Sequence, residues 1–357
     1  MASQVYFMAT PDGVDVGRQT AALEKIYKAS AAADVIQKED FVAIKIHVGE
    51  KHNTTHVKPE LIRALVTKIK GKGGLPFLTE TSTLYKGERD NAIKHLLHAH
   101  QHGFSIEKVG APFIMADGLA GNTEQEVPIN AELHASVKIA REIVVADALI
   151  AVSHPTGHPG SGLGGCIKNL GMGLASRMGK MRQHSTMLPE IKPKTCTFCQ
   201  KCMQWCPATA IVEREGKALI LSDKCIGCGE CLAVCRFGAV SFNWESESAD
   251  LQKSMAEHAY GVVKNKPGKC FYFNVLIDMT TGCDCYSTNQ KKCIPDIGIL
   301  ASRDPVAIDA ATLDLTAKFN QKTLAAIAAP QLDPLIQLRH GEKIGLGSLT
   351  YTLVEIS

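Results

Sequence analysis

Eight of the thirteen cysteines in this 357-residue chain fall into two runs with one repeated spacing. The first run consists of Cys196, Cys199, Cys202 and Cys206, and the second of Cys225, Cys228, Cys231 and Cys235. Three thiolates on a tight loop can hold three corners of an iron-sulfur cube, whose fourth ligand must then come from elsewhere. A structural zinc ion takes four ligands in a closed tetrahedron and would not explain the repeated triplets. The spacing therefore predicts iron-sulfur ligation.

Residues 196–242 resemble the bacterial dicluster ferredoxins, whose cysteine runs have this C-x2-C-x2-C-x3-C form. In that family the fourth cysteine of each run ligates the cluster of the other run. The resemblance implies two 4Fe-4S clusters, one held by Cys196, Cys199, Cys202 and Cys235, the other by Cys225, Cys228, Cys231 and Cys206. Pro207 follows the first run as in the family, whereas Arg236 stands where the second run would have its proline. That proline ligates nothing, so the departure leaves the ligand set intact.

Composition sets limits on the rest of the chain. A hydrophobic content of 45% and a charged content of 21% are typical of a globular protein with one large or two ordinary cores. The net charge of +3 gives no reason to expect nucleic-acid binding. No segment approaches the roughly 20 apolar residues of a membrane span, and residues 1–10 resemble a strand more than a signal peptide. Cysteine-rich metal binding favours a reducing compartment, so we expect a cytoplasmic protein of an organism that keeps oxygen low.

Strand and helix patterns alternate on both sides of the cysteine block. Strands are predicted at residues 1–10, 41–48, 75–79, 112–116, 148–153, 270–276 and 349–356, and helices from Pro59 to about 70, at 88–101, at 248–263 and from Asp304 to 319. This alternation predicts a discontinuous α/β domain, with a parallel or mixed sheet covered by helices and an inserted small α+β ferredoxin-like domain. The expected boundaries are 1–190 and 246–357 for the α/β domain and 191–245 for the insert.

The predicted helix at 88–101 has two distinct faces. Ile93, Leu96 and Leu97 share one face, which we expect to point into the core. His95 and His98 lie on the opposite side, with spacing that could bind a metal. Because no carboxylate or cysteine completes a ligand set nearby in sequence, a solvated face is the better prediction for these histidines.

Several stretches outside the insert resemble the DUF362 family of iron-sulfur proteins. They are residues 45–66, 80–96, 110–119, 153–180 and 296–315. The resemblance covers nearly the whole chain and implies a cytosolic α/β protein that is commonly fused to a ferredoxin module. It implies no particular reaction.

A glycine-rich loop follows the strand predicted at 148–153. It carries His154, His158, Gly160, Gly162, Gly164 and Gly165, and Lys168 follows at an expected helix start. Glycines allow close backbone approach and a helix start offers free N–H groups, so an anion or phosphate site is one interpretation and a structural turn is the other. The spacing formally satisfies G-x-G-x-x-G, but no acidic residue follows at the required distance, so bound flavin or nucleotide has little support.

The glycine-rich loop also resembles, over a short stretch, the corresponding loop of lactate racemase-type proteins. This resemblance implies a small-molecule site flanked by Lys168 and His154.

Cys283, Cys285 and Cys293 form a second concentration of thiols after the insert. C-x-C places two sulfurs on one side of a loop, so a third site for zinc or a further iron-sulfur cluster is one hypothesis. Cys270, Cys166 or His184 could complete it if the fold brings them near. The alternative is that these are ordinary reduced thiols.

Lys45, His47, Lys168 and Asp309 are the candidate catalytic residues. Lys45 and His47 alternate with apolar residues and face the same way near the end of a strand, where open α/β sheets commonly bind ligands. Asp309 is a polar residue inside an apolar helix and could reach the site, face solvent or cap a neighbouring turn.

Two functions fit these observations. In one, the clusters relay single electrons from a soluble ferredoxin- or flavodoxin-type partner to a site on the α/β domain, where an unknown small molecule reacts. In the other, the chain is a non-catalytic electron carrier that docks on a partner enzyme. Exposed cluster edges would favour a homodimer or a ferredoxin-type partner.

Overall fold

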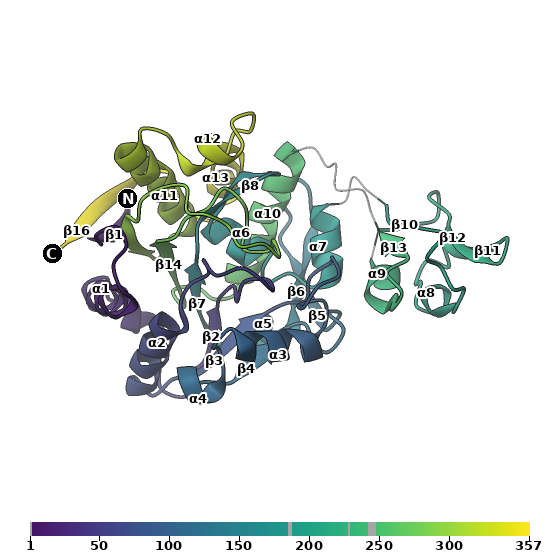
Figure 1. Ribbon diagram of the computed structural model, residues 1–357, viewed down its shortest axis with the longest axis horizontal. Helices are drawn as coiled ribbons and strands as arrows, with labels where there is room; N and C mark the ends of the chain where they lie inside the picture. Colours follow the sequence, from purple (N-terminus) through teal and green to yellow (C-terminus); the bar gives the residue numbers. More distant parts are fainter. Residues whose placement is uncertain (1, 185–187, 228, 242–247) are drawn as a thin grey trace.

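A computed structural model describes residues 2–184, 188–227, 229–241 and 248–357. Within these residues eight strands form one mixed sheet that draws on both sides of the cysteine block (Figure 1). In spatial order they are β16 (Tyr351–Ile356), β1 (Ser3–Ala9), β15 (Gly298–Ser302), β14 (Cys270–Leu276), β7 (Ala148–Ser153), β2 (Phe41–Lys45), β3 (Leu75–Glu80) and β4 (Phe113–Met115). The predicted discontinuous α/β fold is confirmed.

Five adjacent strands, β14, β7, β2, β3 and β4, run parallel. Parallel strands are usually covered on both faces and so consist of nearly continuous apolar residues, as β7 does. Alternate residues of β7 face opposite ways: Ile150 packs in one hydrophobic cluster and Leu149 in the other. Because these strands share one direction, their carboxyl ends meet at one edge of the sheet.

Helices cover both faces of this sheet. On one face lie α1 (Val16–Ala29) and α2 (Pro59–Gly71), whose apolar residues join the cluster that contains Ile150. On the other lie α6 (Cys166–Gly171), α10 (Ser248–Val263) and α11 (Pro305–Asn320), whose residues join the cluster that contains Leu149. Asp304 caps α11 by accepting hydrogen bonds from the backbone N–H groups of Val306 and Ala307, each 2.9 Å long.

Helix α3 (Ala92–Gln101) corrects the prediction for its two faces. Ile93 and Leu97 are 58% and 62% exposed, whereas the side chains of His95 and His98 are buried. The inversion has a physical cause, because His95 Nε2 lies 3.0 Å from Glu80 Oε2 and His98 Nε2 lies 3.1 Å from the Gly49 carbonyl oxygen. Buried polar groups are tolerated when they are hydrogen-bonded, and these partners come from distant loops.

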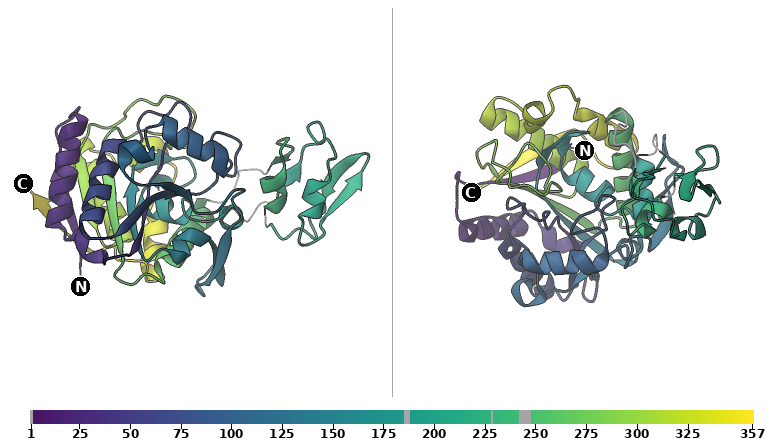
Figure 2. Two further views of the ribbon diagram at one scale, coloured as in Figure 1. Left: turned by 90° about the horizontal axis from the view of Figure 1, so that it is seen from below. Right: turned by 45° about the vertical axis from the view of Figure 1, so that its right-hand side comes forward.

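The insert contains two small antiparallel sheets and two short helices (Figure 2). β10 (Glu190–Ile191) pairs with β13 (Val240–Ser241), and β11 (Ile211–Arg214) pairs with β12 (Lys217–Ile220). The helices are α8 (Lys201–Gln204) and α9 (Glu230–Val234). The pairing of β10 with β13 joins the first and last strands of the insert, so the chain enters and leaves it at one place.

The α/β domain contacts the insert through α7 (Arg177–Gln183) and the segment after β3. Met181 of α7 and Leu84 belong to one hydrophobic cluster together with Cys231 and Leu232 of the insert. A Cβ atom added at Gly229 would collide with the Met181 side chain, so glycine permits this contact.

The remaining elements lie around the sheet. They are η1 (Ala32–Val35), α4 (Ile106–Val109), α5 (Arg141–Val145), α12 (Leu324–Ala328), α13 (Leu335–Lys343), the hairpin of β5 (Glu124–Pro128) and β6 (Ser136–Ala140), and the hairpin of β8 (Thr156–His158) and β9 (Gly162–Gly164). In the described part of the chain, no helix has the length and apolar character needed to cross a membrane.

Candidate functional site

Two pockets in the insert are lined by the cysteines of the repeated runs. One lies between Cys196, Cys199, Cys202 and Cys235, and the other lies beside Cys206, Cys225 and Cys231. Cys228 lies outside the described residues. Each pocket thus takes one cysteine from the opposite run, in the sets that the ferredoxin resemblance implies.

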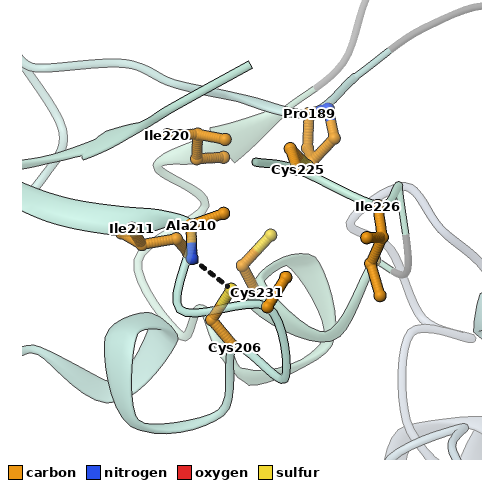
Figure 3. A pocket seen from close by; sticks show the side chains of 10 residues that line it. Pro189, Cys206, Ala210, Ile211, Ile220, Cys225, Ile226 and Cys231 are labelled. Carbon is orange, nitrogen blue, oxygen red and sulfur yellow. Dashed lines mark hydrogen bonds between the residues drawn. The ribbon is translucent and has the colours of Figure 1, made fainter. Parts of the chain in front are cut away.

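The walls of the second pocket suit a buried sulfur-rich group (Figure 3). Ile211, Ile220 and Ile226 line it, and the backbone N–H of Ala210 donates to Cys206 Sγ over 3.2 Å. In the first pocket, burial and the neighbouring Cys196 raise the pKa of Cys202. Thiolates crowded in this way need bound positive charge, which an iron-sulfur cluster supplies.

A second polar site lies at the carboxyl edge of the parallel strands. Lys45 ends β2 and is completely buried, with its Nζ atom 2.8 Å from Asn169 Oδ1 and 3.4 Å from Glu80 Oε1 at the end of β3. Arg89 Nη1 lies 3.5 Å from the same Glu80 oxygen, and Arg89 Nε lies 3.1 Å from Glu50 Oε2. Buried charges are stable only when they are paired, as they are here.

The pKa values in this network follow from burial and pairing. Burial lowers the pKa of Lys45 to about 8, although Glu80 opposes the change. Burial disfavours the charge on Glu80, yet Lys45 and Arg89 hold its pKa well below the usual value. Burial, assisted by Arg89, also lowers the pKa of His47 well below its ordinary value, and His47 Nδ1 accepts a 3.0 Å hydrogen bond from the backbone N–H of Gly49. His47 is therefore a neutral base beside a charged network.

The C-x-C loop reaches the same edge from β14. Lys168 Nζ lies 3.0 Å from Cys283 Sγ, and the backbone N–H of Cys285 donates to that sulfur over 3.4 Å. A hydrogen bond from the Cys285 thiol and the charge of Lys168 lower the pKa of Cys283 to about 5, against the effect of burial. Cys285 shows the opposite direction, since its hydrogen bond to Cys283 and its burial raise its pKa. The pair therefore holds one thiolate and one thiol at neutral pH.

Asp284, between the two cysteines, fixes the loop in place. Its Oδ2 atom lies 2.7 Å from His154 Nδ1, and its Oδ1 atom accepts a 3.0 Å hydrogen bond from Asn53 Nδ2. His154 Nε2 lies 2.9 Å from the Ile277 carbonyl oxygen, so both ring nitrogens face acceptors. Burial would lower the pKa of His154, but Asp284 raises it above the ordinary value. An imidazolium–carboxylate pair thus ties the loops after β7 and β14 together.

The start of α6, where the glycine loop was expected to bind an external anion, is occupied by a side chain of the protein. The Asp309 carboxylate accepts hydrogen bonds from the backbone N–H groups of Cys166 and Ile167, at 2.7 and 2.9 Å. A Cβ atom added at Gly165 would collide with that carboxylate. Asp309 therefore fills the place where an external anion was expected, and it acts as a helix cap without facing the site.

The other glycines of this loop have structural roles as well. Gly162 adopts a φ of +72°, which favours glycine. A Cβ atom at Gly160 would lie 3.0 Å from Leu251, and one at Gly164 would lie 3.3 Å from Lys168. His158 Nδ1 lies 3.0 Å from Ser161 Oγ inside the loop. Lys168 and His154 do flank a common site with Cys283, whereas the glycines shape the turn beside it.

A third metal site at Cys283, Cys285 and Cys293 stays a prediction. Within residues 2–184, 188–227, 229–241 and 248–357, no three histidine, cysteine, aspartate or glutamate side chains come together as a site for a single metal ion, and this holds for the cysteines of the insert as well. Cys166 and Cys270 are buried in the hydrophobic core.

Sequence reasoning missed several residues of this site. Glu80, Tyr85, Arg89 and Asn169 were not among the candidates. The signal for Glu80 was its position at the end of an apolar strand, where a charge seldom occurs without a partner. Arg89 and Asn169 reach the site through loop and helix packing that no local spacing reveals.

Part of this chain is similar to known iron-sulfur proteins. It resembles a putative dimethyl sulfoxide reductase iron-sulfur subunit of Halobacterium salinarum, with 37% identity over 20% of this chain and 30% of that protein. It also resembles an uncharacterized ferredoxin of Methanocaldococcus jannaschii, with 40% identity over 13% of this chain and 30% of that protein. The chain thus spans under a third of the length of these relatives.

Two solved structures resemble the chain at low identity. The lactate racemase apoprotein of Thermoanaerobacterium thermosaccharolyticum aligns with 76% of this chain and 50% of its own, at 12% identity and a TM-score of 0.40. A Thermotoga maritima protein aligns with 90% of this chain and 60% of its own, at 11% identity and a TM-score of 0.42. The model of the family called "domain of unknown function" DUF362 matches residues 42–314, which include the insert and the edge site. This chain belongs to the DUF362 family.

Proposed function

We propose that this chain is an iron-sulfur oxidoreductase in which two 4Fe-4S clusters relay single electrons to the carboxyl-edge site of the α/β domain. Cys196, Cys199, Cys202 and Cys235 would hold one cluster, and Cys206, Cys225, Cys228 and Cys231 the other. Such clusters, when bound, supply one-electron transfer over a wide range of potentials. The two cysteine-lined pockets and the similarity of part of the chain to an iron-sulfur subunit support this part of the proposal.

The observation that carries the enzymatic part is the buried thiolate beside Lys168. A cysteine with a lowered pKa in a polar, partly accessible site is a frequent mark of redox or nucleophilic chemistry. Cys283 has the lowered pKa, its neighbour Cys285 is partly exposed, and both share the edge with the charged network of Lys45 and Glu80. Lys45, His47 and Lys168 are accordingly the residues that we propose to bind or protonate a small-molecule substrate.

One short segment connects the insert to this site. Leu84 packs in the hydrophobic cluster that contains Cys231, and the next residue, Tyr85, places its hydroxyl 2.6 Å from Arg89 Nη2. Cys285 and Cys283 lie close enough to Tyr85 to raise its pKa, in addition to the effect of burial. Residues 84–85 thus contact the cluster side of the molecule through Leu84 and the surroundings of the thiol pair through Tyr85.

A reductive titration tests the proposal. The protein is purified anaerobically, its iron and sulfide are counted, and a one-electron donor is added in steps while cluster absorbance is followed. Two 4Fe-4S clusters require about eight irons per chain. We expect the oxidised chain to take up two electrons more than its two clusters accept, because Cys283 and Cys285, once oxidised to a disulfide, are a two-electron acceptor at the edge site. Uptake of two electrons only would contradict an acceptor on the α/β domain.

The second candidate function is electron carriage without catalysis. The named relatives are an iron-sulfur subunit of a reductase and a ferredoxin. Cys199 is exposed, and Trp205, Ile226 and Phe237 are exposed apolar residues beside the cysteine runs. A ferredoxin-type partner or a partner enzyme would dock there, and the two-electron outcome of the titration would support this alternative.

A further inference from the structure

We propose that Cys283 and Cys285 are a redox-active pair that cycles between a thiolate–thiol form and an internal disulfide, and that the oxidant is a small-molecule disulfide. This inference rests on the proposed function in one respect, because the electrons that reduce the disulfide come through the two clusters. The pair itself is argued from the contacts of the loop.

The backbone of the loop brings the two sulfurs together. The N–H groups of Cys285 and Tyr286 point inward, the first to Cys283 Sγ over 3.4 Å and the second to the Cys283 carbonyl oxygen over 3.0 Å. Gln290 Nε2 donates to the same carbonyl oxygen over 2.9 Å. A turn of this kind shortens the distance between the Cα atoms of Cys283 and Cys285, which are two residues apart in sequence. A disulfide requires that this distance be about 4.4–6.8 Å. The loop can therefore close the bond without a rearrangement of the fold.

The surroundings favour a dithiol over a metal site. The ammonium group of Lys168 lies 3.0 Å from Cys283 Sγ, and an ammonium group cannot act as a ligand while it is protonated. Asp284 would be the natural third ligand, but its two oxygens are held by His154 and Asn53. A cation on one sulfur and a hydrogen bond between the two sulfurs are the features that stabilise a reduced, reactive dithiol.

The two cysteines differ in exposure, and this difference assigns their roles. Cys283 is buried, Cys285 is partly exposed, and the following Tyr286 is 43% exposed. Cys285 is therefore the residue of the pair that a substrate disulfide RSSR meets first. Because Cys285 is only partly exposed, a small-molecule disulfide suits this site better than a folded protein.

The reaction balances in two half-cycles. The Cys285 thiol transfers its proton to Cys283, the Cys285 thiolate attacks RSSR, and RS⁻ leaves and takes the proton from Cys283. The Cys283 thiolate then attacks the Cys285 sulfur of the mixed disulfide and expels the second RS⁻, so that the dithiol becomes a disulfide and RSSR becomes RSH and RS⁻. Two electrons and one proton restore the thiolate–thiol pair, and the electrons come from a reduced one-electron donor of the ferredoxin class through the clusters.

Mass spectrometry of the full protein tests this cycle. Anaerobically purified protein is treated with 2-hydroxyethyl disulfide, its free thiols are alkylated, and it is digested with trypsin. The peptide of residues 270–291 contains Cys270, Cys283 and Cys285. We expect a peptide that is lighter by two hydrogens and carries a single alkyl group on Cys270. Cys270 thus serves as a control within the same peptide.

Matched variants make the outcome decisive. Cys283→Ser should leave a stable mixed disulfide on Cys285, because no second thiolate resolves it, whereas Cys293→Ser should behave like the unchanged protein. Three alkyl groups on the peptide of the unchanged protein would overturn the inference, and so would a mixed disulfide in it that never resolves.

Reduction of the oxidised protein separates this inference from the proposed function. Addition of reduced ferredoxin should reopen the disulfide as the clusters return to their oxidised state. A disulfide that forms with the reagent and stays closed while the clusters remain reduced would support the dithiol pair and overturn the relay.

Discussion

The insert and the carboxyl-edge site both present cysteines, but they are built in opposite ways. The insert gathers its sulfurs from residues 196–235, and they face apolar walls and one another. The edge site gathers Cys283, Lys168 and Glu80 from segments far apart in sequence, and its reactive sulfur faces a cation. Local spacing therefore encodes the chemistry of the insert, whereas the chemistry of the edge depends on the parallel strands that bring these segments together.

The largest expected effect comes from the crossed ligands of the insert. Cys206 follows the first run but lines the pocket of Cys225 and Cys231. Cys206→Ala should therefore remove the cluster associated with the second run and leave the other, so that iron and sulfide fall by about half in a holoprotein with two 4Fe-4S clusters. Iron analysis and low-temperature electron paramagnetic resonance of the reduced protein measure the loss.

Cys293→Ala is the matched control for this loss. Cys293 lies outside the insert and lines neither of the two cysteine-lined pockets. Iron should be unchanged in this variant. A loss of iron in Cys293→Ala, or full retention in Cys206→Ala, would contradict the division between cluster-binding and thiol-bearing regions.

The next effect is on stability at the edge site. Glu80→Gln should lower the free energy of unfolding by about 3–5 kcal/mol, because it leaves Lys45 and Arg89 buried without their shared anion. Urea unfolding of the anaerobic holoprotein measures the change. Glu355→Gln is the control, since Glu355 forms an exposed 3.9 Å ion pair with Lys318 and its loss should cost less than about 1 kcal/mol.

The pH dependence of the Glu80 effect has a definite sign. The folded-state pKa of Glu80 is held well below its ordinary value. The stabilisation that it supplies is therefore complete above its unfolded pKa of about 4.3 and is lost as pH falls toward the folded value. The difference between the unchanged protein and Glu80→Gln should shrink below about pH 4. A difference that grows as pH falls would contradict an ionised Glu80.

Features that depend on local sequence patterns could be predicted, and features that depend on contacts between distant segments could not. Strands such as β7 and helices such as α10 could be predicted because their apolar periodicity is local, and the predicted ranges 148–153 and 248–263 match them. The C-x-C thiols could be singled out, but Glu80 and Arg89 could not, because their partners come from other segments. His95 was misassigned to a solvated face for the same reason, since it is buried by a bond to Glu80 of another element. Asp309 takes the capping role that was one of the alternatives for it.

A smaller effect should appear at the thiolate. Lys168→Met removes the ammonium group 3.0 Å from Cys283 Sγ, so the pKa of Cys283 should rise from about 5 by about one to three. The ultraviolet absorbance of the Cys283 thiolate, followed against pH as the difference from Cys283→Ser, reports this pKa. Lys322→Met, at an exposed position, should leave the titration profile unchanged. A profile in Lys168→Met identical to that of the unchanged protein would show that Cys285 alone stabilises the thiolate.

The smallest expected effect is at Leu97, whose helical spacing predicts a buried residue although the fold leaves it exposed. Leu97 looks like a core residue by helical spacing, yet it is 62% exposed, so Leu97→Gln should change the free energy of unfolding by no more than about 0.5 kcal/mol. Leu65→Gln in α2 is the matched substitution at a buried position and should cost about 2 kcal/mol or more, because it buries an amide without a partner. Thermal or urea unfolding distinguishes the two. Equal losses would mean that Leu97 is packed, and the burial of His95 against Glu80 could then not explain the orientation of α3.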